Sequence, residues 1–456
     1  MRCFSTVLFL VAMVQNTQAA EPLAVFQFAG NAEDSAVGPR SRPIRVGSGV
    51  ALGQGYAFFD GQPKASLDHG NGAEHELRLP DRRETVAEAN RKILAKIPKA
   101  EAVPTYLNPE LIHASVENNV REKYMAISPS LCELLDGTLM IAYHRTSGVD
   151  WLGAYSTWVR TSKDGGRTWG EPRLIAERVQ APGLLRLRSG DLLLNGGEML
   201  AERSTTMRLF RSKDGGRTWV EQRPIWEKSS GIRLQGGCGS LLQLKSGRIL
   251  CPMFGSSGGN YDPGLKAWCY YSDDDGKTWT GGRGKVELPK RGAMEPSVAE
   301  LKDGTLVMAL RTQLGSLYLA RSQDSGETWS QAKSSGLEAP EAPFGMASFP
   351  DSGDLLLVYN SSKFEPNHHH SGERTPLTAA VSRDGGKTWR IVGNIVGGNH
   401  EIGAAGSNSI CFTCDGKVVM AYDWLLIPWD RQIKTGGTWV AIADKQWFYR
   451  NPAKDQ

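Results

Sequence analysis

The sequence predicts an all-β chain that folds as a six-bladed β-propeller, with a short N-terminal extension of strands and one helix ahead of it. Three observations support this prediction: an eight-residue motif occurs five times, a two-residue turn signal occurs six times, and each unit of 50 to 60 residues contains about four short apolar runs. Four strands make one propeller blade. A solenoid is the alternative, but solenoid repeats are usually shorter and need polar capping ends.

The repeated motif is Ser-x-Asp-x-Gly-x-Thr-Trp. Its first copy runs from Ser162 to Trp169, and successive copies begin 50, 60, 50 and 60 residues further along the chain. The short Asp side chain can accept hydrogen bonds from the backbone of its own turn, and the Trp can pack between sheets. Five copies with near-identical neighbours indicate scaffold rather than a unique catalytic site. We therefore predict a structural role for Asp164, Asp214, Asp274, Asp324 and Asp384.

A second repeat interleaves with the first. Six two-residue turns separate short apolar runs, and their glycine permits the positive φ that tight hairpin turns require. Six hairpins and five motifs give six units, the last without a motif. We expect N-terminal and C-terminal strands to close this last blade together, with Thr438–Ala443 as the C-terminal partner. The turns are Asp136-Gly137, Ser189-Gly190, Ser246-Gly247, Asp303-Gly304, Ser352-Gly353 and Asp415-Gly416.

Charged and polar residues stand where the strands of the inner hairpins begin or end, and these strand ends converge on one mouth of a propeller. Arginines beside several acids favour an anion-binding pocket, because the planar guanidinium group suits a carboxylate. The alternative is a ring of mutually neutralising salt bridges. The positions are His144, Arg145, Glu198, Glu295, Arg311, Asn360, Ser407 and Asp423, with Arg374 ahead of the apolar run 377–380.

The repeated motif is identified as the Asp-box of sialidases, and residues 126–449 resemble the propeller of that family. The resemblance implies that each box is a turn between the outer strands of a blade. It also implies a site in which three arginines hold a sugar carboxylate, an aspartate acts as acid/base, and a glutamate assists a tyrosine nucleophile.

The resemblance assigns roles to individual residues. The segment 294–298 with Arg311 resembles the family segment that carries the glutamate and the second arginine, and Arg374 is similar to the third arginine. Arg145 followed by Asp150 resembles the segment with a ligand-contacting arginine and the acid/base aspartate. The predicted catalytic residues are Asp150 and Glu295, and the predicted substrate-binding residues are Arg145, Arg311, Arg374, Glu198 and Asp423.

The sequence departs from the family at two places. The family motif Phe-Arg-Ile-Pro is replaced by Ala-Ile-Ser-Pro at 126–129, which removes the first arginine, and the expected tyrosine is replaced within 407–409, so that the nearest tyrosine is Tyr422. Without that tyrosine the usual covalent intermediate cannot form. An inverting hydrolase needs only an acid and a base, and Asp150 with Glu295 could fill these roles.

These features predict a secreted glycoside hydrolase of the sialidase superfamily that acts on a terminal, acidic sugar in the manner of an exo-α-sialidase. Carbohydrate is the predicted partner. A glycan-binding propeller without turnover is the alternative, since it agrees with the missing arginine and tyrosine. A lyase acting on a uronate polymer is a third hypothesis, with His144 or Tyr422 as its base.

Composition gives no support to other classes of partner. Lys plus Arg number 53 and Asp plus Glu 49, without a dense basic run, so nucleic acid is not predicted. Zinc sites normally need three or four clustered ligands. Neither the pair Cys411 and Cys414 nor the histidine run 368–370, in a polar loop, fits that pattern. We predict no metal and no cofactor, and the sequence leaves disulfide pairing open.

The N-terminal part of the chain predicts export. Residues 1–20 combine Arg2, a short apolar run and small residues before a cleavage point, which is typical of a secretory signal. The apolar run is too short to span a bilayer, so we expect no stable membrane insertion and a secreted or periplasmic location. Residues 21–80 are predicted as a β-rich extension similar to the first strands of a laminin-G domain, 81–123 as a helix and connector, and 124–450 as the propeller.

Overall fold

The computed structural model describes the strands between residues 7 and 76 and the ranges 106–118, 124–146, 155–199, 205–226, 233–236, 241–256, 264–367, 371–397, 403–426 and 435–450. The chain divides into two compact units, Met1–Ile93 and Leu94–Gln456. The helix predicted after Asp81 falls outside the described residues. No helix in the described part is long and apolar enough to cross a membrane.

The described strands of the first unit form three small antiparallel sheets. They are β1 (Val7–Ala12) with β2 (Ala24–Ala29), β4 (Val50–Gly53) with β5 (Tyr56–Phe59), and β6 (Ser66–Asp68) between β3 (Arg45–Val46) and β7 (Glu74–Glu76). Residues 7–12, which the sequence predicts as part of a secretory signal, therefore form a strand in this structure.

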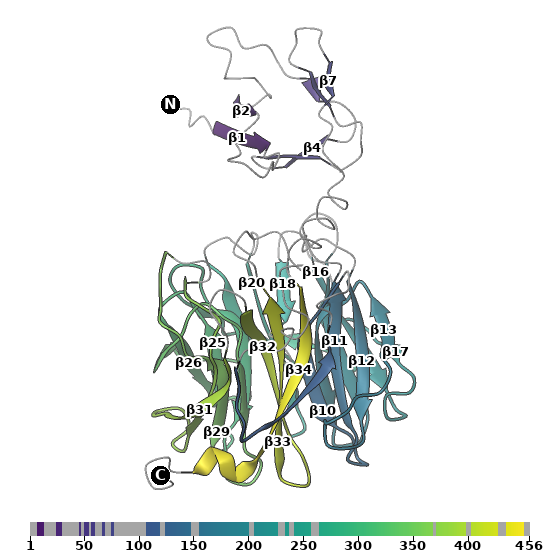
Figure 1. Cartoon of the computed structure of the whole chain (residues 1–456), viewed down its shortest axis with the longest axis vertical. Coiled ribbons are helices and arrows are strands. Elements are labelled where there is room, and N and C mark those ends of the chain that lie inside the picture. Colours follow the sequence, from purple (N-terminus) through teal and green to yellow (C-terminus); the bar gives the residue numbers. More distant parts are fainter. Residues whose placement is uncertain are drawn as a thin grey trace. The chain divides into compact units, whose positions relative to one another are not determined.

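The second unit is a propeller of six antiparallel sheets, which confirms the predicted fold class (Figure 1). Blade 1 comprises β10 (Met125–Glu133), β11 (Leu139–Thr146), β12 (Tyr155–Ser162) and β13 (Arg173–Glu177). Blade 2 comprises β14 (Gln180–Arg186), β15 (Leu192–Met199), β16 (Thr205–Ser212) and β17 (Val220–Glu221). Blade 3 comprises β18 (Arg233–Gly236), β19 (Leu242–Gln243), β20 (Ile249–Ser256), β21 (Lys266–Ser272), β22 (Thr280–Gly281) and β23 (Val286–Glu287).

The remaining blades follow the same plan. Blade 4 comprises β24 (Met294–Glu300), β25 (Leu306–Arg311), β26 (Ser316–Ser322) and β27 (Lys333–Glu338). Blade 5 comprises β28 (Gly345–Ser348), β29 (Leu355–Asn360), β30 (Leu377–Ser382), β31 (Arg390–Gly397) and, at its outer edge, β8 (Tyr106–Leu107). Blade 6 comprises β32 (Gly403–Phe412), β33 (Lys417–Leu426), β34 (Thr435–Asp444) and β9 (Ile112–Glu117), and a 3₁₀ turn, η3 (Lys445–Tyr449), follows β34.

The apolar core lies between the faces of neighbouring blades. Strands covered on both faces read as continuous apolar runs in the sequence. Residues 139–143 of β11 are an example, since every one of these side chains is fully buried. Between blades 5 and 6, Leu356 and Val358 of β29 share a cluster with Val418 and Met420 of β33. This face-to-face packing turns the repeated sheets into one ring.

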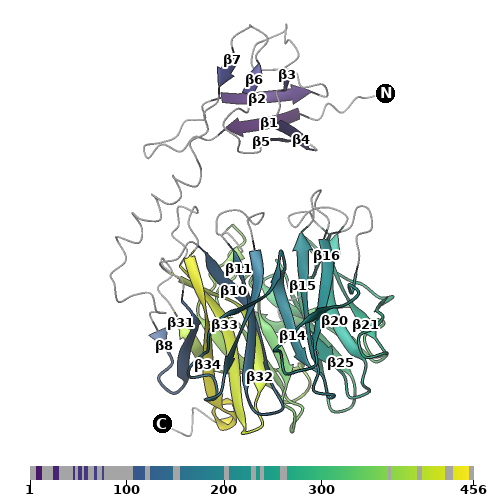
Figure 2. The same ribbon diagram turned by 90° about the vertical axis from the view of Figure 1, so that its right-hand side faces the viewer.

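The ring closes in blade 6, where the N-terminal strand β9 pairs with β34 in the register Val440↔Ala114. This agrees with the predicted closure through 438–443. Figure 2 shows β34 and β8 at the left of the propeller, near β31. Strands β8 and β9 come from the segment that the sequence predicts as an extended connector. They were not predicted as strands, because two short strands separated by polar residues carry little periodicity of their own.

Each blade has two distinct ends. The hairpin turn at Asp303-Gly304 follows the first strand of blade 4, and its Asp-box follows Ser322 at the end of β26, so both lie at one end, which we call the box end. Arg311 ends β25 and therefore lies at the opposite end, the mouth end. The box end is the lower end of the propeller in Figure 1, where η3 lies.

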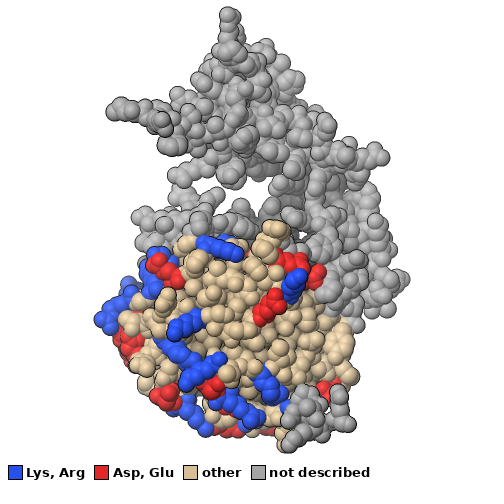
Figure 3. Space-filling view, turned by 90° about the vertical axis from the view of Figure 1, so that its left-hand side faces the viewer, with Lys and Arg blue, Asp and Glu red and all other residues tan. Residues whose placement is uncertain are grey.

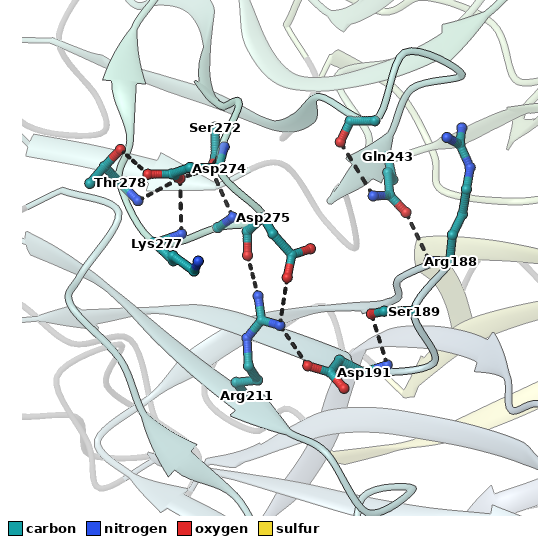
Figure 4. Close-up of polar contacts among 12 residues, drawn as sticks. Arg188, Ser189, Asp191, Arg211, Gln243, Ser272, Asp274, Asp275, Lys277 and Thr278 are labelled. Atoms are coloured by element: carbon teal, nitrogen blue, oxygen red, sulfur yellow. Dashed lines mark hydrogen bonds and ion pairs between the residues drawn. The ribbon is translucent and has the colours of Figure 1, made fainter.

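Every Asp-box holds its own turn by the same hydrogen bonds. In the third box, Ser272 Oγ and the Thr278 N–H both donate to Asp274 Oδ1 at 2.8 Å, and Thr278 Oγ1 donates to Oδ2 at 2.6 Å (Figure 4). These bonds, with that of the Thr278 hydroxyl first, lower the pKa of Asp274 to about 2. Both carboxylate oxygens of Asp274 thus accept hydrogen bonds within their own turn. This turn lies at the box end, whereas Arg311 lies at the mouth end.

Arginines link the boxes of successive blades. Arg211 of blade 2 contacts Asp191 Oδ2 at 2.6 Å and reaches across to Asp275 Oδ2 in the box of blade 3 at 3.0 Å (Figure 4). Equivalent bonds to the backbone of the next box run from Arg173 to the Gly216 carbonyl (2.6 Å), from Arg248 to the Ser325 carbonyl (3.3 Å) and from Arg321 to the Gly385 carbonyl (2.5 Å). The charges at the box end therefore serve blade-to-blade packing.

Candidate functional site

Three first strands carry the same backbone irregularity at the mouth end. In β10, β14 and β24 a bulge places a residue with positive φ directly before a proline: Ser128 (55°), Ala181 (48°) and Glu295 (43°). A non-glycine residue in this conformation is strained by about 1–3 kcal/mol, and such residues concentrate at functional sites. Glu295 is the charged member of the three, so the bulge in blade 4 presents a carboxylate.

Arg311 joins Glu295 to a second carboxylate. Its Nη1 lies 2.9 Å from both oxygens of Glu295, and its Nη2 lies 3.2 Å from Oε1 of Glu341. The exposed fractions of the three side chains are 20% for Glu295, 8% for Arg311 and 2% for Glu341. The guanidinium group therefore bridges a partly exposed carboxylate and a buried one.

Glu341 has further partners. Its Oε1 pairs with Nη1 of Arg291, its Oε2 accepts a hydrogen bond from Nε2 of Gln313 at 2.7 Å, and its main-chain carbonyl accepts one from Nη2 of Arg374 at 3.4 Å. We call this group the Glu341 cluster: Glu295, Arg311, Glu341, Arg291, Gln313 and Arg374. It is assembled from the start of β24, the end of β25, the link between β27 and β28, and the segment before β30.

The predicted residues Glu295, Arg311 and Arg374 thus belong to one cluster. It also contains Glu341, Arg291 and Gln313, which were not predicted from the sequence. The sequence left two hypotheses for the mouth: an anion-binding pocket or a ring of mutually neutralising salt bridges. The described contacts of Arg311 are ion pairs within the protein, as in the second hypothesis. A buried charge needs such a partner, because an unpaired one is strongly destabilising. The signal that could have indicated Glu341 is its place in an otherwise apolar stretch, 339–346, that leads into the first strand of blade 5.

Arg145 lies in a different group, at the closure of the ring. Its Nε is 2.6 Å from Glu117 Oε1, and its guanidinium carbon lies 3.9 Å from the ring centroid of Trp158 and 4.8 Å from that of Tyr124. Glu117 also contacts Nη2 of Arg160 at 3.2 Å and the hydroxyl of Tyr143. We call Glu117, Tyr143, Arg145 and Arg160 the Glu117 cluster. It connects β9 with β11 and β12, so Arg145 takes part in ring closure.

Burial and pairing act against each other on Glu117. Burial alone would raise the pKa of this carboxyl group, but the hydrogen bonds from Arg145 and Tyr143 and the charge of Arg145 outweigh it, so the pKa is lowered. Glu117 is therefore held in its charged form by the strands that it links.

The other predicted binding residues lie on blades 2 and 6. Glu198 on β15 contacts Arg178 at 3.2 Å and Arg208 at 3.7 Å. Asp423 on β33 is buried and accepts a hydrogen bond from the Ser128 N–H at 3.2 Å. It is therefore bonded to the bulge of blade 1. Residues 150 and 368–370, and the side chain of Ser407, lie outside the described part of the chain.

His144 and Tyr422 are unsuited to proton transfer at the mouth. His144 exposes 3% of its surface, burial lowers its pKa to about 4, and its Nδ1 lies 3.2 Å from the Ala181 N–H. Tyr422 is fully buried, which raises its pKa, and its hydroxyl lies 3.4 Å from Nδ1 of His113. Both residues are part of the packed interior, so they give the lyase hypothesis no support and supply no nucleophile.

The described cysteines are unpaired thiols. Cys132, Cys251, Cys269 and Cys411 are buried, and Cys414 is exposed. Burial raises the pKa of Cys251 to about 12, so its thiol stays protonated. Among the described residues, no group of three or more His, Cys, Asp or Glu side chains could hold a metal ion.

Charges of both signs share the face shown in Figure 3. Lysine and arginine side chains lie next to aspartate and glutamate side chains along its lower part, and much of the face carries no charge. Interspersed charges of opposite sign give no extended field of one sign. This face therefore does not form a continuous patch of one sign.

Comparison with known proteins places the propeller in a family. The family model described as "BNR repeat-like domain" matches residues 176–403, half of the chain, and the chain belongs to this family. A comparison with curated protein sequences gives no match.

Solved structures share the fold at low sequence identity. A protein of unknown function from Dyadobacter fermentans is 22% identical with a TM-score of 0.58, over 74% of this chain and 99% of its own. A Hadza microbial sialidase is 18% identical with a TM-score of 0.58, over 74% and 69%. The sialidase of Trypanosoma rangeli is 18% identical with a TM-score of 0.57, over 75% and 61%. The chain therefore has a sialidase-like BNR propeller.

Proposed function

We propose that this chain is a glycoside hydrolase of the sialidase superfamily that removes a terminal sugar at the mouth end of the propeller. The observation that carries the proposal is Glu295: a strained bulge presents its carboxylate at the mouth end, where Arg311 Nη1 lies 2.9 Å from both of its oxygens. Strained, charged residues held by a second residue are typical of catalytic sites. The sialidase-like fold agrees with this role.

The mechanism that we propose uses two carboxyl groups. Glu295 is the general base that activates a water molecule, with Arg311 fixing the orientation of the carboxylate, and Asp150 is the general acid that protonates the leaving oxygen. Sequence positions 407–409 contain no tyrosine and Tyr422 is buried, so a covalent tyrosine intermediate is not part of this scheme. Direct attack by water inverts the configuration at the anomeric carbon.

An acidic sugar, as in an exo-α-sialidase, is the substrate that the sequence predicts. The guanidinium groups of Arg311 and Arg374 suit a carboxylate, since their planar fork can donate two parallel hydrogen bonds to it. A neutral sugar is the second candidate, favoured by the observation that Glu341 already pairs with Arg311.

A glycan-binding propeller without turnover is the alternative of another class. The replaced tyrosine and the burial of Tyr422 favour it. Binder and enzyme differ in one observable: an enzyme releases sugar from a bound glycan.

The test is a screen of the purified protein against aryl glycosides and natural glycans, sialosides included. We expect release of a terminal sugar by the wild type and a loss of 100-fold or more in kcat for Glu295→Gln, because general acid–base catalysis contributes about 10²–10⁴-fold. Glu287→Gln, which alters an exposed carboxylate on β23, is the matched control and should keep wild-type rates. Binding without release would favour the non-catalytic propeller, and full activity of Glu295→Gln would exclude Glu295 as the base.

A further inference from the structure

Glu341 is a carboxylate inside the predicted anion-binding region. Its side chain is 2% exposed, and it meets donors from three positions: Nη2 of Arg311 at 3.2 Å, Nε2 of Gln313 at 2.7 Å, and Nη1 of Arg291. Two guanidinium groups and an amide that converge on one carboxylate make a complete anion site. In this protein the anion in that site is a side chain.

A ligand carboxylate would need the same donors. Arg311 already offers Nη1 to Glu295 and Nη2 to Glu341, so a third carboxylate at this guanidinium group would lie next to two others of the same charge. Like charges in a poorly hydrated site repel one another strongly. Glu341 therefore opposes an acidic ligand both by occupying the donors and by its charge.

A neutral sugar meets no such opposition. Glu295 is 20% exposed, and its carboxylate oxygens can accept hydrogen bonds from sugar hydroxyls while Arg311 keeps them oriented. Pairing with Glu341 leaves Arg311 buried at 8% exposure and fixes its position. The cluster thus orients Glu295 without requiring a charge on the ligand.

We propose that Glu341 determines substrate specificity: it fills the anion site of the mouth from within the protein, so that the wild-type protein selects a terminal sugar without a carboxylate. The proposal rests on the proposed function, because it concerns the sugar bound next to Glu295. It predicts that removal of the Glu341 charge opens the site to an acidic sugar.

The first test compares ligands that differ in one carboxylate. Calorimetry measures binding of methyl glycosides of glucose, galactose and mannose against their uronate counterparts. We expect the wild type to bind the neutral member of at least one pair ten-fold or more tightly than the acidic member. Glu341→Gln should raise affinity for the acidic member at least ten-fold. Glu338→Gln, an exposed carboxylate three residues earlier, is the matched control and should behave as the wild type.

The second test does not need a sugar and tolerates a destabilised variant. Glu341→Ala leaves the donors of Arg291, Arg311 and Gln313 without their anion, so acetate should bind there and raise the melting temperature. We expect 100 mM acetate, compared with chloride at equal ionic strength, to raise the Tm of Glu341→Ala by at least 3 °C. The wild type and Glu338→Ala should show no acetate-specific change.

The outcomes separate the two proposals. Preference of the wild type for the acidic members, an unchanged ligand preference in Glu341→Gln, or no acetate-specific rise in Glu341→Ala would overturn the assignment of Glu341. Acetate rescue without binding of any sugar by the wild type or by Glu341→Gln would instead support the anion site and count against the proposed function.

Discussion

Glu117 is predicted to hold the propeller ring closed, and Glu117→Gln tests this. The carboxylate is 4% exposed and contacts Arg145 at 2.6 Å, Arg160 at 3.2 Å and the Tyr143 hydroxyl. Removing one partner of a buried ion pair costs about 3–5 kcal/mol. Because the two arginine side chains are 17% and 18% exposed and can reach water, we expect the lower end, about 3 kcal/mol.

This free energy translates into a measurable melting shift. For a unit of roughly 360 residues, an unfolding entropy of about 2.1 cal/mol/K per residue converts ~3 kcal/mol into a fall of about 4 °C in Tm. Calorimetry at a fixed scan rate is the assay. Glu110→Gln is the matched control, because Glu110 also ties the N-terminal segment to the C-terminal end, through Arg450 at 2.6 Å, but is 50% exposed. An exposed pair contributes about 0–1 kcal/mol.

The effect of pH gives a second measurement on the same variant. The pKa of Glu117 is lowered in the folded protein, so its contribution to stability is present above the pKa of the unfolded chain and is lost as pH falls through the folded pKa. The difference in Tm between wild type and Glu117→Gln should therefore shrink as pH falls below about 4. Equal melting of Glu117→Gln and wild type at neutral pH, or an equal loss in Glu110→Gln, would refute the role of Glu117 in ring closure.

Three further predictions concern the scaffold and the N-terminus. Asp164→Ala removes the hydrogen bonds of one Asp-box and should lower the free energy of unfolding by about 1–3 kcal/mol in total, seen as a lower Tm. The glycan affinity of the folded protein should stay at the wild-type value, and a loss of affinity at unchanged Tm would contradict this prediction. Gly292→Ala should lower the stability of the fold far more than Gly304→Ala. Both glycines have positive φ, but a Cβ at 292 would lie 2.0 Å from the Leu265 carbonyl oxygen, whereas a Cβ at 304 meets open space. Equal urea midpoints of the two variants would refute this. Mass spectrometry of the exported protein should show an N-terminus near residue 20, and an intact Met1 would exclude the predicted signal.

The propeller was predictable from sequence because its evidence is local and repeated. Each Asp-box contains the serine, aspartate and threonine that bond to one another, so a single eight-residue stretch encodes a whole turn. The hairpin glycines mark a second turn at the same end of each blade. Such signals need no knowledge of the partner blade. Closure through 438–443 was also predictable, since a ring whose last unit is incomplete must take a strand from the other end of the chain.

The Glu341 cluster was only partly predictable, because its contacts are long-range. Arg291 and Glu341 are 50 residues apart and lie in the links before two different blades. No sequence motif predicts such a pair. Glu295 was selected from its strand-end position and by resemblance, and the bulge offers a further physical signal: a proline stands seven residues ahead of the hairpin turn at 129, 182 and 296 alike, and the strained residue directly precedes it.

The partner of Arg145 could not be predicted from the sequence. Its position at the end of a strand predicts a side chain at the mouth, and resemblance adds a ligand contact. In the structure it binds Glu117, which belongs to a strand that pairs with the far end of the chain. Ring closure decides its partner, and closure is the most non-local feature of the fold.

In the proposed reaction, Glu295 acts as a base for direct attack of water on a terminal sugar. Proton NMR of the first sugar released by the wild-type protein, recorded before mutarotation, tests it most directly. We predict a released sugar of inverted anomeric configuration, with no release by Glu295→Gln under the same conditions. A released sugar of retained configuration, or a glycan that binds without any release, would contradict it.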